Sequence, residues 1–253
     1  MKTLMKYDLI LLKRTSKFIV FPAIGIFFAI LSPVTAKYMP EILEALLGAE
    51  GINLGLPEVT VSDSYLQYIG NLFDIFLFVT IFVGVSLFMK QKNKGELPLV
   101  LSKPIKRSNY LISKLSAFSI LIISSLVASG IVFSLYTYYL FGTVDIMLVL
   151  NITLIYFVYT IFILSVSMFM AMFMKSYAGA NIMTFVVYIV FSILGAFSKG
   201  VLDYLPGRVT QRSVELIRSS TEMNTMLPFT LVLVSLSTIL ILVSILKFKK
   251  YDI

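Results

Sequence analysis

Cysteine, histidine and tryptophan are absent from this chain of 253 residues. Without Cys and His there are no disulfides, no thiol nucleophile, no histidine-based metal site, and no Ser-His or Cys-His catalytic arrangement. The glycines are scattered, and no Gly-x-x-x-x-Gly-Lys-Ser/Thr stretch exists to bind a nucleotide through a P-loop. The sequence therefore predicts no catalytic residues, no metal site and no cofactor bound by this chain.

Charged residues are also scarce, at 13% of the chain, whereas 58% of the residues are hydrophobic. A soluble domain carries roughly 25% charged residues spread over its surface. Here the charges form short blocks between long apolar runs, which indicates that most of the surface faces lipid. The net charge of +8 lies beside those runs, where anionic lipid headgroups and membrane topology explain it without nucleic acid.

Six apolar stretches have the length of about 20 residues that a helix needs to cross a bilayer. They predict an all-α membrane protein with six transmembrane helices, in a single transmembrane domain that covers residues 1–253. The predicted spans are residues 18–36, 69–89, 112–140, 146–174, 180–198 and 228–247.

Lys and Arg residues predict the orientation, because they are enriched in cytoplasmic loops. With both termini in the cytoplasm, all other Lys and Arg residues fall on the cytoplasmic side and the outer side keeps only Lys37, Lys199, Arg208, Arg212 and Arg218. Acidic residues run the opposite way, since one outer loop holds Glu41, Glu44, Glu50, Glu58 and Asp63.

Two shorter segments outside the spans have helical patterns. Residues 2–17 mix leucines with cationic residues, which predicts a helix lying in the membrane interface; a short basic tail that only sets topology is the alternative. Residues 40–48 place apolar and acidic residues at helical spacing, which predicts a short helix resting on the outer surface.

The connection between the second and third spans, residues 90–110, has an apolar centre flanked by basic residues. Pro98 and Pro104 bound a short piece of one to two helical turns. Such a centre would be exposed to water unless it met a partner or the membrane surface. A loop that only sets topology would explain the Lys and Arg residues but not the apolar ones, which are Leu97, Leu99, Val100, Leu101 and Ile105.

This connection resembles one in the ABC-2 permease family, the membrane subunits of type 2 ABC transporters. The family pattern reads like Glu-x-Gly-Thr-Leu-Glu-x-Leu-Leu-Ser-x-Pro-Ile-Ser-Arg, followed by a Lys one or two helical turns later. This chain has Gly95-Glu-Leu-Pro-Leu-Val-Leu-Ser-Lys-Pro-Ile-Lys-Arg107, with Lys114 in the trailing position. The N-terminal helix, the six spans and the long loop before the last span also agree with that family.

The resemblance implies that residues 95–107 form a cytoplasmic coupling helix that docks on a separate ABC ATPase subunit, present in two copies. The ATPase would hold ATP and Mg²⁺. A second permease copy or a paralogous permease would complete the transporter, and part of residues 199–227 would re-enter the membrane. The residues that the resemblance assigns to ATPase coupling are Gly95, Glu96, Leu101, Ser102, Lys103, Pro104, Ile105 and Arg107.

The resemblance is greatest to permeases of bacterial bacitracin-resistance and peptide-export systems. It implies an ATP-driven exporter of amphipathic peptides, antibiotics or other hydrophobic compounds in a bacterial plasma membrane, not an enzyme acting on its substrate. Two alternatives remain open: a membrane scaffold or sensor that recruits a cytoplasmic partner through the same connection, and an intramembrane enzyme. The absence of His and Cys argues against most catalytic mechanisms that an intramembrane enzyme could use.

Two polar residues within the spans are candidates for a transport path. Asp74 is expected near the outer end of the second span, where a carboxylate entering hydrocarbon is costly and often functional. A hydrated position at the interface is the alternative for Asp74. Asn181 in the fifth span is the other candidate, although small and polar residues also serve as packing contacts between helices in lipid.

Overall fold

The computed structural model describes residues 2–48, 58–93, 95, 97, 105–197, 203–219 and 226–250. Over these residues the chain is helical and has no strand. Six helices are long and apolar enough to cross a membrane, which confirms the predicted all-α membrane fold. They are Lys17–Ala45, Val61–Asn93, Arg107–Phe141, Ile146–Phe173, Tyr177–Ala196 and Leu227–Lys249.

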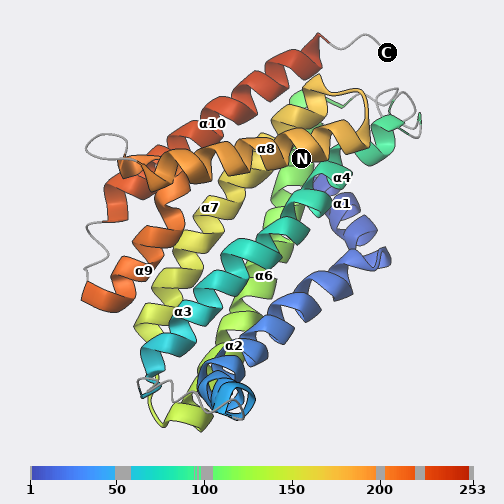
Figure 1. The fold of residues 1–253 in the computed structure, drawn as a ribbon. Helices are drawn as coiled ribbons and strands as arrows, with labels where there is room; N and C mark the ends of the chain where they lie inside the picture. The colour runs from blue at the N-terminus through green and yellow to red at the C-terminus, as the bar shows by residue number, and fades with distance from the viewer. Residues whose placement is uncertain are drawn as a thin grey trace.

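The second of these six helices is built from three consecutive elements, because a π-helical segment interrupts it. The full order is α1 (Lys2–Arg14), α2 (Lys17–Gly48), α3 (Val61–Asn71), η1 (Leu72–Phe76), α4 (Leu77–Asn93), α6 (Arg107–Phe141), α7 (Ile146–Phe173), α8 (Tyr177–Ala196), η3 (Pro206–Arg208), α9 (Val209–Ser219) and α10 (Leu227–Lys249) (Figure 1). Helix α7 is central, since it packs against α4, α6, α8, α9 and α10.

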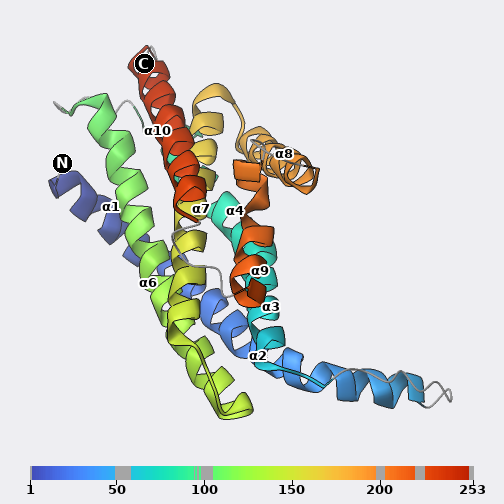
Figure 2. The same ribbon diagram turned by 90° about the vertical axis from the view of Figure 1, so that its left-hand side faces the viewer.

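Helix α2 differs from the sequence prediction at its C-terminal half. Residues 40–48 are helical, as predicted, but they belong to α2, which continues through Pro22, Pro33 and Pro40 to Gly48. Figure 2 shows its last turns projecting away from the other helices. A proline removes one backbone donor and tends to kink a helix, but it does not have to end one.

Local chemistry explains where the helices around α7 begin and end. Asp145 accepts a hydrogen bond from the backbone of Leu148 at 3.0 Å, and Ser176 accepts one from Gly179 at 3.0 Å, so both cap helix N-termini. Gly142 follows α6 with a φ of 76°, a left-handed conformation that glycine adopts at little cost. Short connections therefore place α7 beside both α6 and α8.

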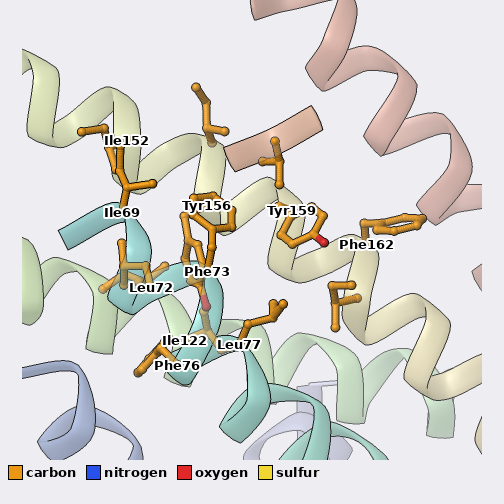
Figure 3. Packing of buried hydrophobic residues seen from close by; sticks show 14 of the residues in the cluster. Ile69, Leu72, Phe73, Phe76, Leu77, Ile122, Ile152, Tyr156, Tyr159 and Phe162 are labelled. Carbon is orange, nitrogen blue, oxygen red and sulfur yellow. The ribbon is translucent and has the colours of Figure 1, made fainter. Parts of the chain in front are cut away.

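Aromatic rings of η1 and α7 meet within the hydrophobic core, which α6 joins through Ile122 (Figure 3). The ring of Phe73 lies 5.0 Å from that of Tyr156, and the ring of Phe76 lies 6.0 Å from it. From α2, the ring of Phe21 reaches Phe76 at 4.5 Å. Edge-on and tilted contacts of this kind add to the energy of burying the rings.

Hydrogen bonds between side chains join α2, α3 and α6 inside the bundle. The Tyr68 hydroxyl lies 2.9 Å from the Ser129 hydroxyl, which donates to the carbonyl oxygen of Gly25 at 3.0 Å. Asn71 donates to the Ser32 hydroxyl at 2.9 Å. In a bilayer, where water does not drive helices together, such polar contacts and close packing hold them side by side.

Candidate functional site: the connection between α4 and α6

Both termini lie toward the same end of the bundle (Figures 1 and 2), and the helix ends that meet there carry cationic residues. This end contains the start of α2, the last turns of α4 and α10, the first turns of α6 and the connection from α7 to α8. We call it the basic end and define it by Lys17, Lys90, Lys92, Arg107, Lys114 and Lys247.

The predicted coupling segment, residues 95–107, joins α4 to α6 at the basic end. Gly95, Ile105 and Arg107 lie among the described residues. The other predicted coupling residues lie outside the described residues: Glu96, Leu101, Ser102, Lys103 and Pro104.

The segment leaves α4 through Gly95. Its φ is 68°, and its backbone N–H donates to the carbonyl oxygen of Lys92 at 3.3 Å. A residue with a side chain adopts this left-handed conformation only at a cost, whereas glycine does not. The match between Gly95 and the family pattern thus has a local reason, because the chain must turn sharply after the last turn of α4.

Leu97 belongs to the apolar centre of the connection and packs inside the protein. It is only 6% exposed, in a cluster that also holds Phe88 of α4, Leu111 of α6, Met168 of α7 and Ile245 of α10. Part of the apolar centre is thus buried by the bundle itself and not by a partner. Ile105, by contrast, is partly exposed.

Arg107, the first residue of α6, is bonded to the C-terminal end of α10. Its Nη1 donates to the carbonyl oxygen of Phe248 at 3.2 Å and to that of Lys249 at 3.0 Å. The last carbonyls of a helix have no partner within the helix and carry partial negative charge. A guanidinium there is well placed to hold the two helix ends together.

Tyr110, one turn further along α6, adds contacts to α10 and to α4. Its ring stacks on that of Phe248 with centroids 5.6 Å apart, and its hydroxyl donates to Oε1 of Gln91 at 2.6 Å. The bond to Gln91 is buried and ties α6 to α4. Helices α4, α6 and α10 are therefore joined around the two ends of the connection.

An ion pair attaches α1 to the same part of α6. Lys114 Nζ lies 3.5 Å from Asp8 Oδ1, and the two side chains are 4% and 5% exposed. The hydroxyl of Ser113 donates to the other carboxylate oxygen of Asp8 at 2.5 Å. Lys114 also lies over the ring of Tyr110, 5.0 Å from its centroid, so α1 is linked to the junction with α10.

Lys92 connects the last turn of α4 to the end of α7. Its Nζ donates to the carbonyl oxygens of Ala171 at 3.2 Å and Met174 at 3.0 Å. The positive charge again lies at a helix C-terminus. The basic residues flanking the connection thus act partly as caps of neighbouring helices.

The model for the family described as "ABC-2 family transporter protein" matches residues 8–252 of this chain. The chain belongs to this family. A search of curated proteins finds no match. ABC-2 permeases are transporter membrane domains and normally work with an ABC ATPase.

Asp74 lies deeper in its helix than the sequence predicts for this ABC-2 permease. The helix begins at Val61, not near residue 69, so Asp74 is about 20 Å along it at a rise of 1.5 Å per residue. It belongs to the π-helical segment η1, where Phe73 and Phe76 are buried while Asp74 and Ile75 are exposed on the outside of the chain. Single π-helical turns within α-helices are frequent at functional sites.

Asn181 lies in the first turns of α8, toward the basic end. It is buried, and its Nδ2 donates to the carbonyl oxygen of Tyr177 at 2.9 Å, while its Oδ1 has no hydrogen bond within the described part of the chain. Over those same residues, no hydrogen bond or ion pair joins Asn181 to Asp74. The role of these two residues in a transport path stays a prediction.

Sequence reasoning missed the partners that hold the connection, namely Asp8, Gln91, Tyr110 and Phe248. Each looks ordinary in the sequence: an isolated acid, an amide, and two aromatic residues near span ends. Arg107 and Phe248 are 141 positions apart, so no local pattern links them. One residue could have pointed to them. Lys114 matches the Lys that follows the family pattern, and a lysine that is buried at that position needs an acidic partner.

Proposed function

We propose that this ABC-2 permease is the membrane subunit of an ATP-driven exporter and that a separate ATPase docks on the connection between α4 and α6. ATP and Mg²⁺ are held by the ATPase, whose closure displaces residues 95–107. The permease residues take no chemical part in hydrolysis.

One observation carries this proposal: the connection is bonded at its C-terminal end to helices beyond the two that it joins. Arg107 donates to the last carbonyls of α10, and Tyr110 stacks on Phe248 of α10 while donating to Gln91 of α4. A push on the connection would displace α4, α6 and α10 together. Through Lys114 and Asp8 it would also displace α1.

The distribution of charge supports an orientation with the basic end in the cytoplasm. Cationic side chains at this end fit the excess of Lys and Arg on cytoplasmic sides. An ATPase that uses cytoplasmic ATP must dock there. On this orientation α1 lies at the cytoplasmic interface, where its basic residues meet the headgroups.

Asp74 supports pairing with a second permease, either a second copy or a related chain. A carboxylate exposed on the outside of one chain, about 20 Å along a spanning helix, is costly against hydrocarbon. Facing a second permease across a hydrated path would remove that cost.

The resemblance to bacitracin-resistance and peptide-export permeases favours amphipathic peptides or antibiotics as substrates and a bacterial plasma membrane as the location.

Co-purification tests the docking. The tagged chain is isolated in mild detergent from its native membrane, as wild type and as Ile105→Asp, which adds a charge to the partly exposed end of the connection. The matched control is Tyr139→Asp, which adds the same charge at a side chain 84% exposed near the far end of α6. Lys106→Glu, at an exposed position, is a second variant less able to disturb folding.

We expect a P-loop ATPase to accompany the wild type and Tyr139→Asp, and to be lost from Ile105→Asp and Lys106→Glu at unchanged gel-filtration profiles. If no ATPase co-purified with the wild type, the proposal of an ATP-driven exporter would be overturned. Recovery of a cytoplasmic protein without a P-loop would favour the scaffold or sensor instead.

A further inference from the structure

A cavity of about 250 Å³ opens at the basic end where α1, α2, α4 and α6 meet. Three lysines line it, one each from α2, α4 and α6: Lys17, Lys90 and Lys114. Its polar lining also includes Asp8 and Ser86. The cavity lies beside the α1–α6 ion pair and has no part in the proposed docking of the ATPase.

The charges in this cavity do not cancel. Asp8, its acidic residue, is already engaged by Lys114 at 3.5 Å and by the Ser113 hydroxyl. Lys17 donates to the neutral hydroxyl of Ser86. Lys90 forms no hydrogen bond or ion pair with any described residue. Two ammonium groups thus face the same space without a carboxylate of their own.

Apolar surface adjoins the charged part of the cavity. Leu11 and Leu87 contribute to its lining. Directly after Lys17, the side chains of Phe18, Ile19 and Val20 are exposed at the start of a membrane-spanning helix. A ligand that suits both surfaces has an anionic head and an apolar tail.

We propose that this cavity binds the phosphate headgroup of an anionic membrane phospholipid, with an acyl chain along the exposed face of Phe18 to Val20. The phosphate oxygens accept hydrogen bonds from Lys17 and Lys90, which removes the repulsion between these two charges. The bound lipid bridges α2 and α4 beneath α1. It thereby holds α1 in the place where Asp8 pairs with Lys114.

Binding of a fluorescent phosphatidylglycerol to the purified full-length chain in neutral detergent tests this site. The variant Lys17→Gln/Lys90→Gln removes both uncompensated charges. The matched control is Lys6→Gln/Lys13→Gln, which removes the same charge from exposed positions of α1 that do not line the cavity. Lys90→Gln alone, at an exposed side chain, guards against a folding defect.

We expect affinity to fall about fivefold for Lys90→Gln and about thirtyfold for Lys17→Gln/Lys90→Gln, because each lysine near an anionic surface contributes about fivefold. The control stays within about twofold of the wild type. Phosphatidylcholine and inorganic phosphate do not displace the probe. If both double variants lost affinity equally, the binding would depend only on general surface charge. That result would overturn the proposed site. Displacement of the probe by inorganic phosphate would show that the cavity binds a free anion and would overturn the proposal of a lipid ligand.

Discussion

The two ends of the bundle are held together by different kinds of contact. At the basic end, polar side chains cross long distances in sequence: Arg107 reaches the last turn of α10, and the buried Asp8 pairs with Lys114 of α6. These contacts join separate helices. They involve charges that are at least partly removed from water, so removing one partner of a buried pair leaves the other charge uncompensated.

At the opposite end, one charged contact crosses between helices, because Lys37 of α2 donates to the carbonyl oxygen of Leu140 in α6 at 2.6 Å, whereas the ion pairs are local. Asp203 pairs with Arg208 at 2.8 Å and with Arg212, and Arg212 pairs with Glu215 at 3.3 Å. All four side chains are partly exposed and lie within one short stretch that contains α9. Two backbones also approach each other closely there, at Gly195 and Gly207.

Polar contacts at the basic end link α1, α4, α6, α7 and α10, whereas Lys37 at the opposite end links only α2 to α6. Contacts between distant helices move several helices together, whereas contacts within one segment stabilise only that segment. This supports the proposal that an ATPase docks at the basic end. Four substitutions test the comparison, from the largest expected effect to the smallest.

Asp8→Ala has the largest expected effect. It leaves the ammonium of Lys114 buried without its partner, which we expect to lower the free energy of unfolding by about 4 kcal/mol. The measurement is unfolding in detergent by denaturant. In the control Asp8→Ala/Lys114→Met no charge remains buried, so most of the loss is recovered; equal stability of the two variants would contradict the account.

Gly207→Ala breaks the close approach at the opposite end. A Cβ atom there would lie 1.7 Å from the carbonyl oxygen of Phe191 in α8, so the backbones must separate. We expect a loss of about 2 kcal/mol in the free energy of unfolding. Gly70→Ala is the matched control, since nothing lies within 4 Å of its added Cβ and alanine favours the helix. If Gly207→Ala and Gly70→Ala changed the free energy of unfolding equally, the close packing of Gly207 against α8 would be refuted.

Arg107→Gln sharpens the comparison at the basic end. Losing the bonds to Phe248 and Lys249 costs about 1 kcal/mol of unfolding free energy, because the site is partly exposed. The specific result expected is faster amide hydrogen exchange in the last turn of α10, with little change in α7. Lys247→Gln, on α10 itself, is the control. Unaltered exchange at the end of α10 would show that Arg107 does not hold it.

Asp203→Asn has the smallest expected effect. Ion pairs this exposed contribute about 0.5 kcal/mol and weaken as salt increases. Denaturant unfolding at low and high ionic strength measures this dependence. A loss as large as that of Asp8→Ala would erase the difference between the two ends.

The sequence was sufficient to predict the six helices, because lipid imposes a simple requirement on length and hydropathy. It failed where contacts between helices decide the outcome. Nothing local signals the π-helical turn at Asp74, or that α2 runs through Pro33 and Pro40 to Gly48.

The candidate site was predictable only as a segment. The family pattern and the apolar centre located residues 95–107, and the role of these residues in docking stays a prediction. That Leu97 faces the bundle, and that Arg107 bonds to α10, depends on packing between helices far apart in sequence. A one-dimensional pattern does not contain that information.

The most direct test of the central claim is a site-specific cross-link to the ATPase. Because the chain has no cysteine, Lys106→Cys introduces a unique thiol for a photoreactive maleimide, and Tyr139→Cys places the same label near the opposite end. Native membranes carrying each labelled variant are irradiated, and the adducts are identified by mass spectrometry. The account predicts a P-loop ATPase joined to Lys106→Cys and absent from Tyr139→Cys. Equal labelling of the two positions, or adducts without an ATPase, would contradict docking at this connection.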